Sequence, residues 1–350
     1  MLKVMAAGSK SGSKAGGKLA LGGELALIQH IRERAAGARG FGVRLGIGDD
    51  CAILRVRAGE EIVVTTDLSL EGRHFRRDWH PAAAVGHRVL ARGLSDVAAM
   101  GARPIAAFLS LALPSVVAKD RRWVDGFLSG LLALAKLHRV PLAGGDTAEA
   151  PGDAVIADIM LVGAAKTGRA LRRSGARAGD VLYCTGALGG AAAELAALAE
   201  APRRFAKAAA DGTHPHLFPQ PRLAAGQALL RRGLATACID LSDGLSTDLA
   251  HLCEASGVAA EVEASRIPLH ALAEKLSPEA RMHAALHGGE DYELLFTARA
   301  ATRVPAMLGG VAVTRIGRIV KRGGPQVALV DAEGHRKTLE PGGWEHFREA

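Results

Sequence analysis

Acidic residues beside glycine, serine or threonine recur along this chain, each close to an apolar run. The first pair closes Leu45-Gly46-Ile47-Gly48-Asp49-Asp50, where the preceding residues are mostly small or apolar. An acid in such surroundings can point into a cleft without burying an unpaired charge in the core. The same arrangement recurs at Val63-Val64-Thr65-Thr66-Asp67, Leu94-Ser95-Asp96, Gly144-Gly145-Asp146 and Ile239-Asp240-Leu241-Ser242-Asp243.

These acidic clusters together predict a magnesium site that handles a phosphorylated ligand. Several carboxylates that converge on one cleft repel one another unless cations lie between them. Hard divalent cations take oxygen ligands, and Mg²⁺ typically binds one or two carboxylates together with substrate phosphates. A turn or a helix cap is the ordinary alternative for any single cluster. The recurrence of one residue pattern is what favours the metal site.

Length, charge and cysteine usage restrict the class of protein. A chain of 350 residues is longer than a typical single core, so we expect two domains. The net charge of +8 comes from scattered basic pairs and aromatic residues make up only 4%, which disfavours nucleic-acid binding. The four cysteines are far apart, which argues against zinc and disulfides and predicts a cytoplasmic location. The longest apolar run, Ile105 to Leu113, is too short to span a membrane.

Composition divides the chain into a tail and two domains. Residues 1–19 are rich in Gly, Ser, Lys and Ala and are expected to be disordered. An Arg- and Gly-rich stretch, 168–179, marks the boundary between the domains. We therefore expect an N-terminal domain over 20–167, which carries most of the acidic clusters of the predicted metal site, and a C-terminal α/β domain over 168–350.

The spacing of apolar residues predicts alternating helices and strands. The predicted helices are 24–35, with Leu25, Ile28 and Ile31 on one face, 81–100, 119–139, 191–200, a helix that ends at Ser256, and helices within 269–287. The predicted strands are 45–55, 61–67, 105–113, 140–143, 154–165, 180–185, 235–240, 258–263, 292–298, 311–320 and 326–330. Because many strands lack a crossover helix, we expect an α+β protein with mixed-sheet α/β domains.

The N-terminal domain has few helices with which to cover its strands. The two main ones, 81–100 and 119–139, would cover a single face of the sheet, which leaves the other face apolar. A patch of that size is seldom left in water, and two copies paired about a two-fold axis would bury it. A homodimer is therefore predicted, with coverage by the second domain as the alternative.

Six motifs follow one another along the chain. They are Gly46-Ile47-Gly48-Asp49-Asp50, Thr65-Thr66-Asp67, Ser95-Asp96-Val97-Ala98-Ala99-Met100-Gly101-Ala102, Gly144-Gly145-Asp146-Thr147, Asp240-Leu241-Ser242-Asp243-Gly244 and Gly288-Gly289-Glu290-Asp291-Tyr292-Glu293. In this order they resemble the motifs of the thiamine-monophosphate kinase family, which belongs to the aminoimidazole-ribotide synthase superfamily. The resemblance covers about residues 22–350, and the six motifs in order are far more specific than any one of them.

The resemblance implies a fold of the aminoimidazole-ribotide synthase type and an ATP- and Mg²⁺-dependent phosphorylation of thiamine monophosphate to thiamine diphosphate. It also implies a homodimer paired through sheets of the first domain. The metal ligands that it implies are Asp50, Thr65, Thr66, Asp67, Asp96, Asp146, Asp240 and Asp243. The implied ATP contacts are Gly145, Asp146, Arg173 and Ser242, and the implied substrate contacts are His74, Glu290 and Trp344. Catalysis would depend mainly on Asp67, Asp146, Asp243 and Arg173.

The chemistry that the resemblance implies needs no general base. The acceptor is a phosphate monoester, whose second pKa is about 6, so its oxygen is already anionic at neutral pH. The sequence offers no evident Ser-His or Cys-His pairing, which favours direct in-line transfer. Two alternatives stay open: another ATP-dependent synthetase of the superfamily, such as an aminoimidazole-ribotide or selenophosphate synthase, and a non-catalytic protein that binds Mg-nucleotide.

Overall fold

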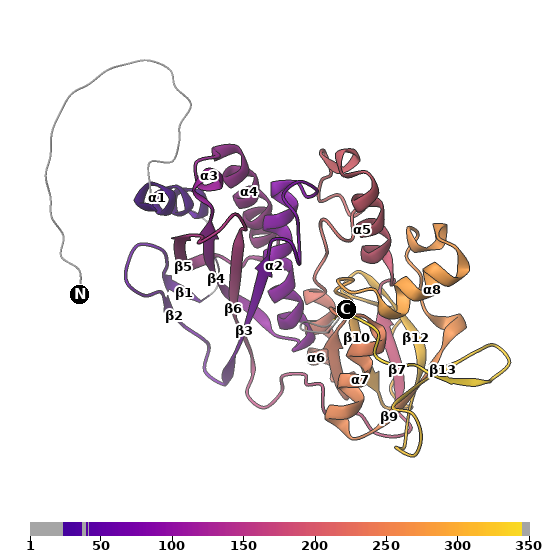
Figure 1. The fold of residues 1–350 in the computed structure, drawn as a ribbon. Helices are drawn as coiled ribbons and strands as arrows, with labels where there is room; N and C mark the ends of the chain where they lie inside the picture. The colour runs from indigo at the N-terminus through magenta and orange to yellow at the C-terminus, as the bar shows by residue number, and fades with distance from the viewer. Residues whose placement is uncertain (1–23, 37–39, 41, 345–350) are drawn as a thin grey trace, which may run out of the picture.

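Two mixed α/β units, each built on its own β-sheet, follow one another along the chain (Figure 1). The structure is a computed structural model, and it describes residues 24–36, 40 and 42–344. The predicted disordered tail, residues 1–19, lies outside the described residues. The first sheet has the strand order β3-β6-β4-β5, and the second has the order β14-β13-β9-β12-β7-β10-β8, with β11 paired to β12. The predicted α+β class with mixed sheets is confirmed.

The elements of the first unit alternate as the apolar spacing predicts. They are α1 (Glu24–Ala35), β1 (Val43–Leu45), β2 (Ile53–Leu54), β3 (Glu60–Leu70), α2 (Ala82–Ala99), β4 (Arg103–Leu113), α3 (Ser115–Ala118), α4 (Arg121–His138), β5 (Leu142–Glu149) and β6 (Ile156–Lys166).

The second unit contains the remaining elements. They are β7 (Val181–Thr185), α5 (Gly190–Glu200), η1 (Pro202–Phe205), α6 (Leu223–Arg232), β8 (Ala237–Asp240), α7 (Leu245–Ser256), β9 (Ala259–Glu263), η2 (Ala264–Arg266), η3 (Ala273–Lys275), α8 (Pro278–His287), β10 (Leu294–Ala298), β11 (Met307–Leu308), β12 (Val311–Val320), β13 (Val327–Val330) and β14 (Arg336–Thr338).

Helices α2 and α4 pack closely against each other beside the first sheet (Figure 1). Glycines make this approach possible: a Cβ at Gly86 would lie 1.9 Å from the Phe127 carbonyl oxygen, and one at Gly130 would lie 1.8 Å from that of Ala83. With α2 fixed in this way, its Ser95 side chain reaches Asp240 of the second unit. The long buried face of α2 explains why this helix can position several functional side chains.

The opposite face of the first sheet is apolar and partly open. The side chains of Ile62, Val64 and Leu68 on β3 are about half exposed, at 54%, 59% and 49%. The β1–β2 ribbon covers another part of this face, where Val43 and Leu54 pack against a cluster that includes Ile105, Val162 and Ala164.

Helix α6, which the sequence analysis does not predict, joins the two units through α2. A Cβ at Gly226 of α6 would lie 2.0 Å from the Ala98 carbonyl oxygen, so the two helix backbones are in direct contact. One hydrophobic cluster extends from Leu94 on α2 through Leu229 on α6 to Phe296 on β10. This shared core sets the position of the second unit against the first.

Several predicted elements differ from the structure. The strand predicted over 45–55 is wrong: only β1 and β2 are extended, and Gly48 between them has a φ of 131°. The helix predicted over 119–139 begins instead at Arg121, because the Asp120 carboxylate accepts from the backbone nitrogen of Arg122 and caps the helix. The strand predicted over 140–143 continues to Glu149, so Asp146 lies within β5 and not after a strand.

Helix α1 matches its predicted bounds, and one residue of its predicted apolar face, Ile31, is buried whereas another, Ile28, is not; the side chain of Leu25 lies outside the described residues. Leu27 and Ile31 are buried, whereas Ile28 is 37% exposed. The helix therefore packs along positions 27 and 31, and Ile28 lies beside this stripe. The strands β11 and β14 and the short helix α3 have no counterpart among the predicted elements.

Candidate active site

A cleft of about 1360 Å³ lies between the two units, where α2, the loop after β3 and the loop before β10 meet. The C-terminal segment 341–344 lines the same cleft. Eight of the predicted metal, ATP and substrate contacts line it: Asp67, His74, Asp96, Asp240, Ser242, Asp243, Glu290 and Trp344.

Three carboxylates from three different elements form an acidic cluster at one end of the cleft. Asp67 comes from β3, Asp96 from α2 and Asp240 from the end of β8. The Thr65 hydroxyl donates a hydrogen bond to Asp96 Oδ2, and the Ser95 hydroxyl donates to Asp240 Oδ2 over 2.7 Å. The hydroxyl-acid pairs of the sequence motifs therefore meet across the two units.

The acidic cluster is short of positive charge. Burial, with Asp96 adding its repulsion, raises the pKa of Asp67 to about 6, although Arg92 acts in the opposite direction. Burial and the neighbouring Asp96 raise the pKa of Asp240 to about 7. The potential metal-ligand atoms that converge here are all oxygen atoms, from carboxylates and one threonine hydroxyl. Mg²⁺ prefers such oxygen ligands. The residues present therefore fit a magnesium ion.

Glu290, at the other end of the cleft, is already paired with Arg88 and hydrogen-bonded to His216. Its Oε1 atom lies 2.7 Å from Arg88 Nη2, and its Oε2 atom lies 3.1 Å from His216 Nδ1. Burial alone would raise the pKa of Glu290, but Arg88 and His216 hold it well below its usual range. This carboxylate is ionised and fixed in place without a metal.

A chain of hydrogen bonds fixes the histidines around Glu290. Since a carboxylate only accepts, His216 Nδ1 carries the proton toward Glu290, and His216 Nε2 then accepts from His80 Nε2 over 3.0 Å. His80 Nδ1 accepts in turn from the backbone nitrogen of Arg76 over 3.2 Å. Both rings are neutral in this arrangement, and burial lowers the pKa of each.

The loop that carries Glu290 has an unusual backbone. Glu290 and Tyr292 have φ values of 70° and 50°, a region that non-glycine residues seldom adopt, and such strain gathers at functional sites. Asp291 between them accepts from the backbone nitrogens of Gly189, over 2.7 Å, and Ala191, over 3.1 Å. These bonds anchor the loop to the start of α5 and hold the Glu290 side chain in the cleft.

The loop Ser242-Asp243 is tied to both α7 and the C-terminal segment. Asp248 Oδ2 accepts from the backbone nitrogens of Asp243, over 3.0 Å, and Gly244, over 3.1 Å. The backbone nitrogen of Trp344 donates to the Asp243 carbonyl over 3.2 Å, and the Trp344 side chain is 48% exposed at the rim of the cleft. Trp344 and Asp243 are thus brought together across about a hundred residues of sequence.

Other predicted site residues lie outside the cleft lining. Asp50 is exposed between β1 and β2, and Thr66 points to the open face of β3, opposite to Thr65 and Asp67. Gly145 and Asp146 are exposed within β5.

Asp146 lies on the same open face of the first sheet. The strand registers align it with Ser110 on β4, then Asp158 on β6 and Leu68 on β3. The exposed Arg173 does not line the cleft, yet its charge lowers the pKa values of Asp96 and Asp240 against the effect of burial. In this single chain the predicted ligands are therefore divided between the two faces of the first sheet.

The basic residues of the cleft are not among the predicted site residues. Arg88 and Arg92 lie on α2 at four-residue spacing before Asp96, which places all three on one stripe of the helix. That spacing is a signal in the sequence, because a buried stripe of charge needs partners from elsewhere. His80 and His216 have no comparable signal, since their partners come from distant segments.

One Ser-His pair does exist, although none was evident in the sequence. The Ser246 hydroxyl lies 2.9 Å from His287 Nδ1, and the same oxygen accepts from the backbone nitrogen of Gly342 over 3.2 Å. Ser246 is fully buried, so its hydroxyl anchors the C-terminal segment and is closed to a substrate.

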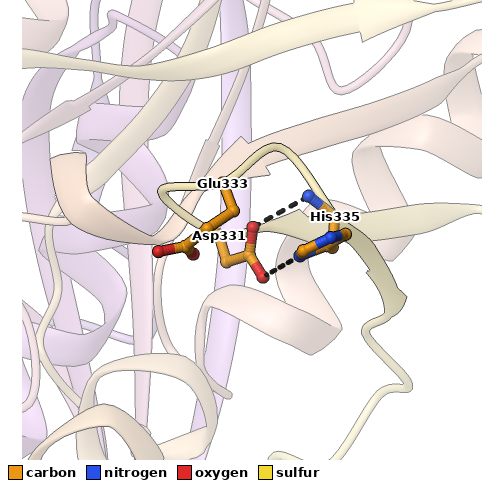
Figure 2. Close-up of side chains that lie close together, drawn as sticks. All are labelled: Asp331, Glu333 and His335. Atoms are coloured by element: carbon orange, nitrogen blue, oxygen red, sulfur yellow. Dashed lines mark hydrogen bonds and ion pairs between the residues drawn. The ribbon is translucent and has the colours of Figure 1, made fainter.

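Figure 2 shows a further group of potential metal ligands, in the turn between β13 and β14. Asp331, Glu333 and His335 are exposed, and their ligand atoms lie within 4.8 Å of one another. The Asp331 carboxylate accepts from the His335 backbone nitrogen over 2.8 Å and contacts its ring at 3.1 Å. Closure of the hairpin turn accounts for this arrangement.

The two units of the fold match two family models. Residues 48–165 match the AIR synthase related protein N-terminal domain, and residues 177–330 match the corresponding C-terminal domain. The chain belongs to the AIR synthase related proteins. A hydrogenase maturation protein HypE in complex with ATP, at 18% identity and a TM-score of 0.71, shares this fold.

The chain belongs, within that group, to the thiamine-monophosphate kinase family. It is 39% identical to thiamine-monophosphate kinase of Escherichia coli K12 over 93% of this chain and 98% of the relative. The crystal structure of thiamine-monophosphate kinase from Stenotrophomonas maltophilia has a TM-score of 0.73 at 37% identity, covering 86% of this chain and 95% of that one. A structure of AaThiL complexed with AMPPCP and TMP has a TM-score of 0.71 at 30% identity, covering 93% and 97%.

Proposed function

We propose that this protein transfers the γ-phosphoryl group of ATP to thiamine monophosphate and so forms thiamine diphosphate. The observation that carries the proposal is that the two ends of one cleft differ. Burial raises the pKa values of Asp67 and Asp240 in the acidic cluster, whereas Arg88 and His216 hold the pKa of Glu290 low at the other end. A phosphorylated substrate with a cationic organic part fits this division, with its phosphate toward the acids and its organic part toward Glu290. The named relatives support the choice of this substrate.

The residues of the acidic cluster would hold the magnesium. Asp67, Asp96 and Asp240 supply carboxylates from rigid elements, and Thr65 orients Asp96. Bound Mg²⁺ would neutralise phosphate charge, the dominant contribution to catalysis in phosphoryl transfer. Asp243 and Ser242 lie in the same cleft, and the roles proposed for His74 and Trp344 are contacts to the thiamine part.

The remaining predicted metal and ATP contacts are also part of this proposal. Asp50, Thr66, Gly145 and Asp146 are assigned to the metal and nucleotide. Thr66 and Asp146 lie on the open face of the first sheet, Gly145 precedes Asp146 in β5, and Asp50 lies between β1 and β2. Arg173 is assigned to ATP, and its charge already acts on the acidic cluster. We also propose a domain division near residues 167–168 and a cytoplasmic location.

One assay tests the proposed function. Purified protein with ATP and Mg²⁺ is expected to form ADP and thiamine diphosphate in equal amounts only when thiamine monophosphate is present. ATP consumption with other acceptors and none with thiamine monophosphate would favour another synthetase of the superfamily. Nucleotide binding without turnover under any of these conditions would favour a non-catalytic protein.

We propose that the transfer is direct, without a phosphoenzyme. Three of the four cysteines are buried, burial raises their pKa values, and the Ser246 hydroxyl is closed to the cleft. No protein-bound label should therefore be trapped after incubation with γ-labelled ATP alone. A stoichiometric labelled enzyme that then reacts with thiamine monophosphate would refute direct transfer.

We propose that two copies pair through the open face of the first sheet. Ile62, Val64 and Leu68 expose apolar surface there, and burial of such a face is favourable. Sedimentation is expected to give twice the chain mass, and Val64→Asp is expected to shift the protein toward the monomer. A fully active wild-type species at the 36.2 kDa chain mass would contradict the dimer.

No helix in the described part of the chain combines the length and apolar character that a bilayer crossing requires.

A further inference from the structure

Arg92 lies on α2 between the two ends of the cleft. Its Nη2 atom is 3.4 Å from Asp67 Oδ1, in the acidic cluster, and its Nη1 atom is 3.9 Å from Glu290 Oε1 at the other end. The side chain is 18% exposed and lines the cleft. Arg92 is thus a cation at the middle of the cleft, in reach of both groups of carboxylates.

The donors of Arg92 are poorly used by the described residues. A guanidinium group has five N–H donors, and charge-assisted bonds to carboxylates normally measure about 2.7–2.9 Å. Arg92 makes a single hydrogen bond, the 3.4 Å contact to Asp67, and its buried Nε atom has no hydrogen-bond partner in this part of the chain. An unsatisfied buried donor costs about 1–3 kcal/mol, so its retention calls for an explanation.

The neighbouring Arg88 shows what a structural arginine on the same helix looks like. Arg88 donates to Glu290 over 2.7 Å, to the His74 carbonyl over 2.9 Å and to the His216 carbonyl. Its side chain is 4% exposed, and these hydrogen bonds use its donors within the protein. Arg92, one turn further along α2, keeps its donors for a group that enters the cleft.

We propose that Arg92 binds the phosphate of the acceptor substrate and holds it for attack on ATP. This inference rests on the proposed function. The acceptor's organic part belongs near Glu290 and the transferred group belongs near the acidic cluster, so the acceptor phosphate must lie between them. Arg92 occupies that interval, and its planar fork matches two phosphate oxygens.

The transfer balances without a proton. An anionic oxygen of the acceptor phosphate forms a bond to the γ-phosphorus of ATP, and the bond from that phosphorus to the β–γ bridging oxygen breaks. ADP leaves with the electron pair of the broken bond. Arg92 offsets the repulsion between the two anions and fixes the acceptor oxygen in line, which makes it a residue that touches substrate.

Binding measurements without nucleotide separate this role from the chemistry. Calorimetry would compare thiamine monophosphate with thiamine, which lacks the phosphate, for the wild type, Arg92→Met and Arg92→Lys. We expect Arg92→Met to weaken binding of thiamine monophosphate about tenfold or more and that of thiamine less than threefold, as loss of a bidentate charged contact predicts. Arg92→Lys should lie between, because it keeps the charge and loses the fork.

Arg103→Met is the matched control. Arg103 pairs with Glu60 over 3.0 Å at the far end of the first sheet and does not line the cleft. Its variant should bind both ligands as the wild type does, and thermal unfolding would verify that each variant is folded. If Arg92→Met did not fold, Arg92→Lys would decide. The quantity compared would again be its loss of affinity for thiamine monophosphate relative to its loss of affinity for thiamine.

Steady-state kinetics give the second readout. We expect the KM for thiamine monophosphate to rise about tenfold in Arg92→Met while the KM for ATP changes less than threefold. Equal losses for thiamine and its monophosphate, no loss for either, or a rise in the KM for ATP alone would overturn the inference. A wild-type protein that does not phosphorylate thiamine monophosphate would refute the proposed function instead.

Discussion

The two ends of the cleft hold carboxylates in opposite electrostatic states. At the acidic cluster, burial raises the pKa values of Asp67 and Asp240 to about 6 and about 7. At the other end, Arg88 and His216 overcome burial and hold the pKa of Glu290 well below its usual range. Both ends lie in one cleft, and side chains of the same helix α2 line it, so the difference comes from the partners that the chain supplies.

That difference separates carboxylates that lack a cationic partner from a carboxylate that the fold already pairs with an arginine. Neighbouring carboxylates repel one another when no cation lies between them, and a bound metal ion offsets that repulsion. A carboxylate paired with arginine is instead part of the folded framework, and removal of its partner leaves a buried charge. Substitutions at the two ends should therefore act on different quantities, activity at the first and stability at the second.

The largest effect is expected at the acidic cluster and at Asp243 in the same cleft. Asp67→Asn and Asp243→Asn should each lower kcat by two orders of magnitude or more at saturating Mg²⁺, because metal-assisted charge stabilisation dominates phosphoryl transfer. Asp67→Asn should leave the midpoint of thermal unfolding unchanged or higher, since one repelling charge is removed. Asp331→Asn, in the exposed hairpin of Figure 2, is the control and should keep full activity. Near-wild-type turnover of either cleft variant would remove that residue from the metal site.

The next effect is on the free energy of unfolding and concerns Arg88. Arg88→Met should destabilise the protein by about 3–5 kcal/mol, because Glu290 would remain as a buried charge with a weakened partner set. The double variant Arg88→Met/Glu290→Gln should recover part of that loss. Urea unfolding of Arg88→Met, Glu290→Gln, the double variant and the wild type measures these differences. If the double variant lost the sum of the single effects, the pairing of these two side chains would not be what stabilises this end.

A third prediction concerns magnesium and the stability of the wild type. Mg²⁺ binds only the folded acidic cluster, so at a hundredfold excess over its dissociation constant it should add about 2.7 kcal/mol of stability. The thermal midpoint should rise with Mg²⁺ in the wild type and rise less in Asp96→Asn and Asp240→Asn. Glu290→Gln should keep the full Mg²⁺ response. An equal response in all the variants would place the bound ion outside the acidic cluster.

The sequence predicted the acidic cluster better than the paired end. The motif acids Asp67, Asp96 and Asp240 each lie on or end a helix or strand whose apolar pattern is strong. The elements that carry them could therefore be predicted from the sequence. Arg88 and Glu290 are 202 positions apart, and no local rule connects them. Ion pairs of this kind follow from how the units pack on each other, which periodicity does not encode.

Strand alternation separates two of the predicted metal ligands. Thr65 and Thr66 are neighbours on a strand, so their side chains must face opposite sides of the sheet. Only Thr65 reaches the acidic cluster, and Thr66 lies on the open face. The extended strand predicted over 45–55 failed for another reason, because a run of small residues with Gly48 at a φ of 131° has no strong preference for a strand.

The smallest effect is a pH dependence of stability at the paired end, and it comes from His80. This ring is 4% exposed, and burial, with repulsion from Arg88 and His216, lowers its pKa to about 3. The charge of Glu290 acts in the opposite direction without reversing the shift. The folded state therefore keeps His80 neutral, whereas the unfolded chain gains its proton below about pH 6.5.

Stability from this ring is consequently present above pH 6.5 and is lost as the pH falls toward 3. Between pH 7.5 and pH 5 the loss should reach up to about 2 kcal/mol for His80, with His87, whose burial lowers its pKa to about 4, contributing in the same direction. His80→Gln should show a shallower decline in the free energy of urea unfolding over this range. A variant with the wild-type slope would mean that His80 is protonated in the folded protein, and the neutral hydrogen-bond chain to Glu290 would then be wrong.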